Sequence, residues 1–270
     1  MAEETASHSA RPQAGEILRR VIHDAEEELD RSASGLAFSG LAAGLTMGLS
    51  GLGVAVLAHF LPDRHWTPLV EYLLYPLGFL AVIIGRAQLF TENTLYPVVL
   101  VLDRRERYLD TLRLWAVVFC ANVLGVLVFA VLMTQVHTIR RPTQEMLAEL
   151  GANAVTGSFG HVFWTGVVGG WLIALVAWLV EGAEMSIGQI VLIWLLAYLV
   201  GIGGFAHCIA TSGEILVAVL GGAVGGWRYL SWLVAATAGN VAGGVLIVAL
   251  LNYGQVMAGG GRRAARRRSA

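Results

Sequence analysis

The stretch GRAQLFTEN (residues 85–93) places Arg86, Gln88, Glu92 and Asn93 inside an apolar segment that runs from about residue 67 to 102. A second apolar segment, about 187–222, is interrupted in the same way by GIGGFAHCIATSGE (residues 201–214). As a single helix each segment would be about 50 Å long, whereas the hydrocarbon core of a bilayer is about 30 Å thick. The sequence therefore predicts two broken helices, with breaks at 86–93 and 207–214.

Composition places the chain among membrane proteins with several spans. Hydrophobic residues make up 56% of the chain and charged residues 14%, and the mean hydropathy is +0.67. A spanning helix needs about 20 apolar residues. Stretches long enough to span lie at 36–61, 67–102, 111–135, 156–181, 187–222 and 229–252. We therefore expect an all-α membrane protein with six transmembrane helices.

The six segments divide into two similar halves. WAVVFCANVLGVLVFAVLM (115–133) resembles WLVAATAGNVAGGVLIVALL (232–251), which sets Asn122 against Asn240. An odd number of spans per half forces the two copies into opposite orientations, and in such folds the path lies where the broken helices meet. The pattern predicts two inverted three-helix repeats in which helices 2 and 5 are broken.

Polar segments flank the six spans, which gives three expected regions: 1–35, 36–253 and 254–270. The first is polar and amphipathic, and its helical face could lie on the membrane or dock on the cytoplasmic mouth. It lacks the pattern of a cleaved signal peptide. The last is a short basic tail that suits a topology signal and contact with lipid headgroups.

The arginines predict the orientation of the spans, because cytoplasmic loops are enriched in basic residues. With both termini in the cytoplasm, the inner segments hold Arg11, Arg19, Arg20, Arg31, Arg104, Arg105, Arg107, Arg113, Arg262, Arg263, Arg266, Arg267 and Arg268. The outer loops then hold Arg64, Arg140, Arg141 and Arg228. We therefore expect a multi-pass protein whose two termini are cytoplasmic.

No residue pattern indicates a cofactor, a metal site or a nucleic-acid partner. The two cysteines, Cys120 and Cys208, lie in apolar runs without metal-ligand spacing, so we interpret them as reduced packing residues. The expected surroundings are the lipid bilayer.

His207 and Thr91 are the first candidates for the transport path, because each lies in one of the two predicted breaks. An ionisable group within a span is costly and normally faces a cavity or a partner. The inverted symmetry brings the two breaks together, so the Thr91 hydroxyl is placed to hydrogen-bond an imidazole nitrogen. An alternative role for Thr91 is to cap the second half-helix.

Leu89 and Phe90 would add a bulky apolar barrier beside this polar pair. A bare anion meets a large desolvation penalty there, whereas its neutral protonated form meets a much smaller one. The pattern suggests that a weak-acid anion gains a proton, crosses as the neutral acid and releases the proton on the far side. His207 could supply that proton or polarise a water that does.

The charged residues at the breaks each have two candidate roles. Arg86 and Glu92 could form a buried ion pair that pins the loop, or attract the substrate. Glu214 could pair with Arg86 across the repeat interface or reach the headgroups. Asn93 and Thr211 complete the polar set at the two breaks.

GFLAVIIGRAQLFTEN, GGFAHCIATSGE and the two helices containing NVLG and NVAGG resemble the formate/nitrite transporter family over residues 36–253. The resemblance implies a six-helix, aquaporin-like protomer of a homopentamer in the bacterial inner membrane, with one path per protomer. It implies transport of small monovalent anions such as formate or nitrite, often with a proton, and no enzymatic activity. On the matching positions Leu89, Phe90 and Thr91 occupy the loop of the second helix and His207 is the central histidine. Tyr75 and Phe79 match part of an apolar constriction.

The chain departs from the family pattern at several positions. Glu92 stands where the family usually has Gly, Gln88 and Ala206 replace acidic residues, Thr211 replaces Asn, and Thr165 replaces a vestibule lysine. These departures leave the architecture in place and weaken the assignment of the substrate.

Two other functions have partial support in the sequence. A pore for a small neutral solute, of the aquaporin type, would need an Asn-Pro-Ala pair where this chain reads TEN and IATS. An intramembrane hydrolase could use Ser212 as nucleophile and His207 as base, but both residues share one break and the sixth span holds no histidine.

Overall fold

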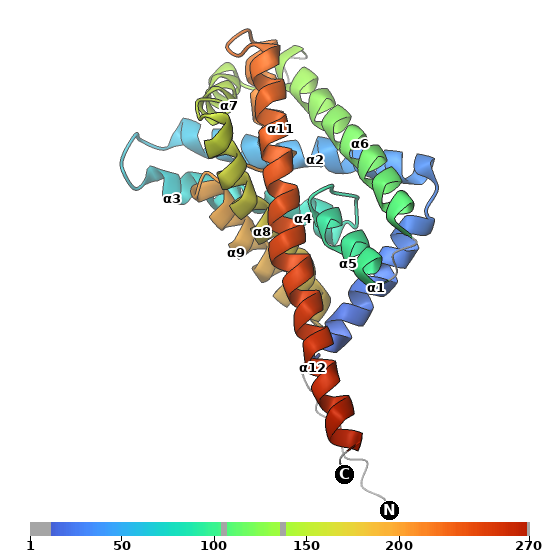
Figure 1. Cartoon of the computed structure of the whole chain (residues 1–270). Coiled ribbons are helices and arrows are strands. Elements are labelled where there is room, and N and C mark those ends of the chain that lie inside the picture. Colours follow the sequence, from blue (N-terminus) through green and yellow to red (C-terminus); the bar gives the residue numbers. More distant parts are fainter. Residues whose placement is uncertain (1–11, 104–106, 136–138, 269–270) are drawn as a thin grey trace, which may run out of the picture.

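The computed structural model describes residues 12–103, 107–135 and 139–268 of the chain, and every regular element in these ranges is helical (Figure 1). Arg11, Arg104 and Arg105 of the orientation argument lie outside the described residues. The elements are α1 (Ala14–Asp30), α2 (Ala33–Phe60), α3 (Thr67–Glu71), η1 (Tyr72–Leu74), α4 (Pro76–Ile84), η2 (Glu92–Thr94), α5 (Tyr96–Asp103), α6 (Tyr108–Gln135), α7 (Arg141–Ala154), α8 (Phe159–Gly182), α9 (Ser186–Ile202), α10 (Ala210–Leu220), α11 (Gly226–Ala242), a π-helical segment (Gly243–Ala249) and α12 (Leu250–Arg268).

Both over-long apolar segments are broken, as the sequence predicts. In the first, α4 ends at Ile84 and the chain runs through a loop to η2, with Arg86 in the left-handed region at a φ of 53°. In the second, α9 ends at Ile202 and α10 begins at Ala210. Gly204 turns the chain at a φ of 62°, a conformation that glycine adopts without a steric penalty.

The position predicted for the second break was partly wrong. The break covers 203–209, so His207 lies within it, but Thr211 and Glu214 lie in the first turns of α10. The physical reason is the glycine pair at 203 and 204, which ends α9 before the polar residues begin.

The predicted inverted repeat is visible in two matching sets of hydrogen bonds. Asn122 of α6 donates to the carbonyl oxygens of Gly40 and Gln88 and accepts from the Phe90 N–H. Asn240 of α11 repeats this pattern with the carbonyl oxygens of Gly166 and Ala206 and the Cys208 N–H. Each asparagine therefore satisfies the exposed backbone of one broken helix, which has no water to bond inside a membrane.

Glycines allow the helices of each half to pack with their backbones in contact. A Cβ on Gly44 of α2 would overlap the carbonyl oxygen of Asn122, and a Cβ on Gly170 of α8 would overlap that of Asn240. The α2–α6 pair and the α8–α11 pair are thus related by the repeat, and each depends on small residues, as is common between membrane helices.

Replacing one of these glycines gives a first testable prediction. We expect Gly44→Ala to destabilise the protein by about 1–3 kcal/mol, because the added methyl forces α2 away from α6. Gly160→Ala is the matched control, since a Cβ there meets no atom within 4 Å. Thermal unfolding in detergent, followed by tryptophan fluorescence, measures both. Equal midpoints for the two variants would contradict the close packing.

Two amphipathic helices cover opposite ends of the bundle (Figure 1). The N-terminal helix α1 docks on the bundle and does not extend away from it. Arg20 of α1 donates a hydrogen bond to the Glu181 carbonyl oxygen of α8, and Arg113 of α6 donates one to the Leu29 carbonyl oxygen of α1. α7 packs on α10 and α2 at the other end and was not predicted. Its sequence is too polar for a span, so hydropathy gave no signal for it.

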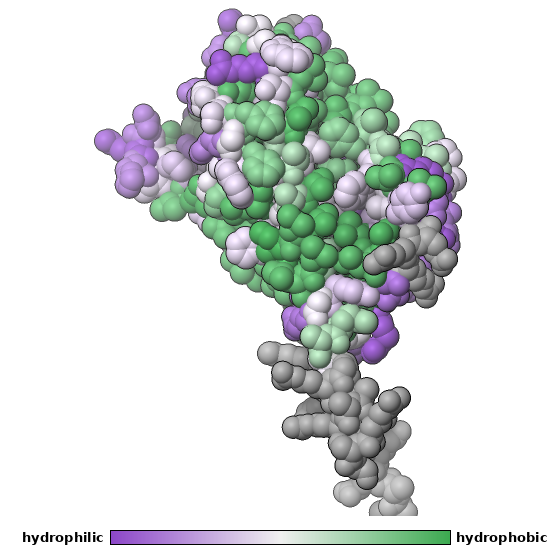
Figure 2. Space-filling model, viewed as in Figure 1, coloured by the Kyte–Doolittle hydropathy of each residue, from purple (hydrophilic) through white to green (hydrophobic). Residues whose placement is uncertain are grey.

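The outer surface suits a bilayer. Figure 2 shows apolar residues over the body of the molecule and polar residues gathered toward its ends. Large apolar side chains such as Phe38, Trp164 and Trp227 are 76%, 68% and 81% exposed. Cys120 and Cys208 are both free, as expected.

Candidate functional site

The two breaks meet at a hydrogen bond between Thr91 and His207. The Thr91 Oγ1 and His207 Nε2 atoms are 2.8 Å apart, and both side chains are fully buried. The sequence predicts this contact from the inverted symmetry, although the two residues are 116 positions apart. It joins the first half of the chain to the second at the centre of the bundle.

A second hydrogen bond fixes the tautomer of His207. The backbone N–H of Ala210 donates to His207 Nδ1 over 3.0 Å, so Nδ1 carries no proton in this arrangement. The proton of the neutral imidazole therefore lies on Nε2 and is donated to the Thr91 oxygen. The hydrogen of the Thr91 hydroxyl is left free to be donated elsewhere. His207 also caps the first turn of α10 through this bond.

Apolar side chains surround this bridge. Phe79 of α4 is fully buried and presents its ring to the imidazole at a centroid distance of 5.0 Å and an interplanar angle of 84°. Tyr75 follows Phe79 on the same side, with ring centroids 5.8 Å apart. Leu89 is fully buried, whereas the Phe90 ring packs on Trp115 and Phe119 of α6.

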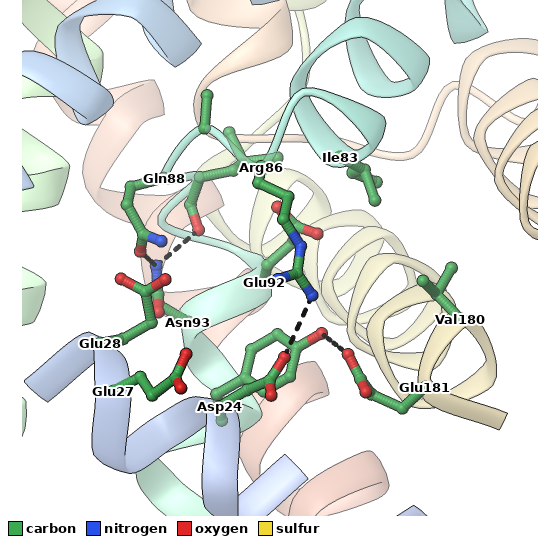
Figure 3. Close-up of a pocket in the computed structure, with 13 residues that line it drawn as sticks. Asp24, Glu27, Glu28, Ile83, Arg86, Gln88, Glu92, Asn93, Val180 and Glu181 are labelled. Atoms are coloured by element: carbon green, nitrogen blue, oxygen red, sulfur yellow. Dashed lines mark hydrogen bonds and ion pairs between the residues drawn. The ribbon is translucent and has the colours of Figure 1, made fainter. Parts of the chain in front are cut away.

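A cavity of about 110 Å³ opens beneath α1, and we call it the α1 cavity (Figure 3). Leu89 and Glu92 form part of its wall. The side chains of Asp24, Glu27 and Glu28 extend from α1 toward the chain segment 85–93. Glu181 of α8 completes the acidic lining and accepts a hydrogen bond from Tyr96.

Arg86 corrects two expectations from the sequence. Its guanidinium group lies 3.5 Å from Asp24 and its side chain is 80% exposed, so it pairs with α1 and neither with Glu92 nor with Glu214. The Arg86 backbone lies in the left-handed region, which is uncommon for a residue other than glycine. Asn93 lines the α1 cavity, and its amide donates to the Gln88 side chain and to the Leu89 carbonyl oxygen.

A larger cavity, of about 330 Å³, opens at the other end beneath α7, and we call it the α7 cavity. Thr211 and Glu214 of α10 line it together with Tyr75. Thr91, His207 and Phe79 line neither this cavity nor the α1 cavity. The hydrogen-bonded bridge and Phe79 therefore form a closed neck between two open mouths.

Sequence reasoning missed the residues that elements distant in the chain bring to the two mouths. Asp24, Glu28 and Glu181 join the α1 cavity, and Asn153 and His161 join the α7 cavity. The sequence shows the acidic residues of α1, but it does not show where α1 docks on the bundle. Only the path of the chain places these side chains at the mouths.

The contacts of Ser212 rule out the arrangement that a serine hydrolase needs. Its hydroxyl donates to the Cys208 carbonyl oxygen over 2.6 Å and lies 3.2 Å from the Tyr229 hydroxyl. His207 uses its two ring nitrogens for Thr91 and Ala210, so it does not contact Ser212. A base must reach its nucleophile within about 3 Å.

Known proteins share this architecture. The family model described as "Formate/nitrite transporter" matches residues 15–254. "Inner membrane protein YfdC" of Escherichia coli (strain K12) is 33% identical over 244 residues, which cover 89% of this chain and 78% of the relative. A solved "FNT family ion channel" superposes with a TM-score of 0.79 at 20% identity, covering 87% of this chain and 97% of the other. A structure described as "Pentameric formate channel with formate bound" gives a TM-score of 0.71 at 18% identity, covering 83% and 98%.

Proposed function

The chain belongs to the formate/nitrite transporter family, and on that premise we propose that it transports small monovalent weak-acid anions, such as formate, together with a proton. Its membrane-crossing helices and two opposed cavities support transport through the protomer itself. The bound formate of the related channel supports this substrate class.

The hydrogen-bonded neck between the two mouths is the observation that carries the proposal. An anion would lose its water at Leu89 and Phe79 and find no cation there among the residues that the structure describes, which makes passage of the bare ion costly. The neutral acid meets a much smaller barrier, and the free Thr91 hydroxyl can donate to its carbonyl oxygen. We propose that the substrate crosses the neck in this neutral form.

His207 acts in this scheme by positioning Thr91, and the proton transfer takes place before the substrate reaches the neck. Its Nε2–H group holds the Thr91 oxygen, which directs the hydroxyl hydrogen toward the path. Its Nδ1 atom accepts the Ala210 N–H, so a second proton on the imidazole would require that bond to break. The proton that neutralises the anion therefore reaches the neck with the substrate.

We further propose a homopentamer in a bacterial inner membrane, with both termini in the cytoplasm. The related formate channel is described as pentameric, and the relative YfdC is described as an inner membrane protein. The excess of arginine in residues 11–31, 104–113 and 262–268 supports the orientation. Each protomer would hold its own path, since the two cavities and the neck lie within one chain.

Flux measurements in proteoliposomes test this function. The purified protein is screened against formate, nitrite, hydrosulfide, lactate and acetate across a pH range, with glycerol and water as neutral controls and empty liposomes as the background. We expect uptake of at least one anion, with alkalinisation of the solution that it leaves, and no faster glycerol flux than in empty liposomes. Flux of the neutral solutes alone would favour the aquaporin-type pore instead.

A further inference from the structure

Glu92 and Glu214 lie in the two cavities, one on each side of the neck. Glu92 is 9% exposed and lines the α1 cavity, and Glu214 is 8% exposed and lines the α7 cavity. Among the residues that the structure describes, neither carboxyl group has a hydrogen-bond or ion-pair partner. Buried carboxyl groups are normally paired, so these two call for an explanation.

A structural role does not account for the two carboxyl groups. An isolated buried charge costs several kcal/mol, and a charge that holds a fold together needs a cation or several donors around it. Arg86 is the cation closest to Glu92 along the chain, and it pairs with Asp24 at the surface of the cavity. Groups that are buried, unpaired and open to a cavity are suited to exchanging protons with what enters that cavity.

The surroundings of Glu92 favour protons over anions. Asp24 and Glu28 of α1 and Glu181 of α8 add negative charge around it, and Tyr96 of α5 is bonded to Glu181. Such a field raises the local concentration of protons and lowers that of free anions. A weak-acid anion that enters this cavity is therefore stabilised when a neighbouring group protonates it.

The surroundings of Glu214 are built to hold a carboxyl group without pairing it. A Cβ on Gly51 of α2 would come within 2.8 Å of Glu214 Oε1, so the absence of a side chain there leaves room for the carboxyl group. The titratable neighbours that share the α7 cavity are Tyr72, Tyr75 and His161. Thr211 lies one turn earlier on α10 and lines the same cavity.

We propose that Glu92 and Glu214 are the proton-exchange groups of the path, one for each mouth. This inference rests on the proposed transport of weak acids. On entry, the O–H bond of one carboxylic acid breaks and an O–H bond forms on the anion. The neutral acid passes the neck, its O–H bond breaks, and the proton joins the carboxylate at the other mouth. Each glutamate then returns to its starting state by exchange with water in its cavity, so no other reactant is needed.

The pH profile of formate flux separates this relay from direct protonation in solution. A simple carboxylic acid titrates near pH 4, so its neutral fraction falls about tenfold per pH unit above that value. With the same pH on both sides, wild-type flux should change by less than about tenfold between pH 5 and pH 7. In Glu92→Gln/Glu214→Gln the substrate must arrive already protonated, and flux should fall by about 100-fold over the same range.

Matched controls isolate the two buried carboxyl groups. Asp30→Asn removes a carboxylate from the exposed C-terminal end of α1, outside the α1 cavity, and Glu149→Gln removes one from the exposed face of α7. Both should keep the wild-type profile. The single variants Glu92→Gln and Glu214→Gln should each steepen it, and Glu92→Asp and Glu214→Asp, which keep the acid, should restore the shallow slope. If the double variant does not purify as a monodisperse protein, the pH profiles of the two single Gln variants decide the test.

The outcomes distinguish this inference from the proposed function. Absence of flux for every anion in the wild type would remove the proposed function. Wild-type formate flux with an unchanged pH profile in the double Gln variant would leave transport in place and overturn the role of the two glutamates. A steep profile already present in the wild type would overturn it as well.

Discussion

Asn240→Ala is expected to lower the thermal midpoint of the protein by about 6–12 °C. The substitution leaves the Cys208 N–H and the carbonyl oxygens of Gly166 and Ala206 without their partner. Each buried polar group left unpaired costs about 1–3 kcal/mol, so the total is at least about 3 kcal/mol. A loss of that size corresponds to several degrees for a chain of this length.

The repeat supplies an internal check on this prediction. Asn122→Ala should cause a loss of similar size, because Asn122 makes the corresponding three bonds in the other half. Asn252→Ala is the matched control, since the Asn252 side chain makes a single bond, to the Val248 carbonyl oxygen one turn earlier in the preceding π-helical segment. Size-exclusion chromatography of heated samples measures all three. If the thermal midpoint of Asn240→Ala equals that of the control, the stabilising role assigned to the two asparagines is wrong.

His207→Asn and Thr91→Val are expected to lower formate flux by about 10- to 100-fold at every pH. Thr91→Val removes the hydroxyl that would donate to the neutral acid, and His207→Asn loses the Nε2–H group that orients it. A lost buried hydrogen bond of about 1.4–2.8 kcal/mol in the crossing step gives this range. The shape of the pH profile should stay as in the wild type, because neither residue supplies the proton in this scheme.

The two residues should act as one unit. The double variant Thr91→Val/His207→Asn should transport about as slowly as the slower single variant, because the first substitution already removes the shared hydrogen bond. Ser212→Ala is the control, since Ser212 lies close to His207 in the chain but bonds to Cys208 and Tyr229. Unchanged flux in His207→Asn would remove His207 from the mechanism. Losses that multiply in the double variant would show that the two side chains act independently.

The sequence alone was sufficient for the class of fold and for the core of the neck. A segment of about 36 apolar residues cannot cross a bilayer as one straight helix, so the polar stretch around Thr91 had to break it. The resemblance of the helices that carry Asn122 and Asn240 implied inverted repeats. From that symmetry the contact between Thr91 and His207 followed, and the structure contains it.

Other features depended on contacts that the sequence does not reveal. The partner of Arg86 is Asp24, which lies on α1, a helix whose docking position the sequence does not reveal. The second break began four residues earlier than expected, at the glycines before the polar residues. α7 was absent from the predicted elements, although it forms part of the wall beside Glu214.

Hydropathy and segment length determined the number of spans and the need for two breaks, because the bilayer acts on each segment of the chain separately and regardless of its neighbours. The tertiary structure alone decided which carboxyl groups surround Glu92, which residues line the cavity of Glu214 and how the two nitrogens of His207 are used. These depend on side chains from helices far apart in the sequence, and a charge or a donor has a defined partner only once those helices are packed.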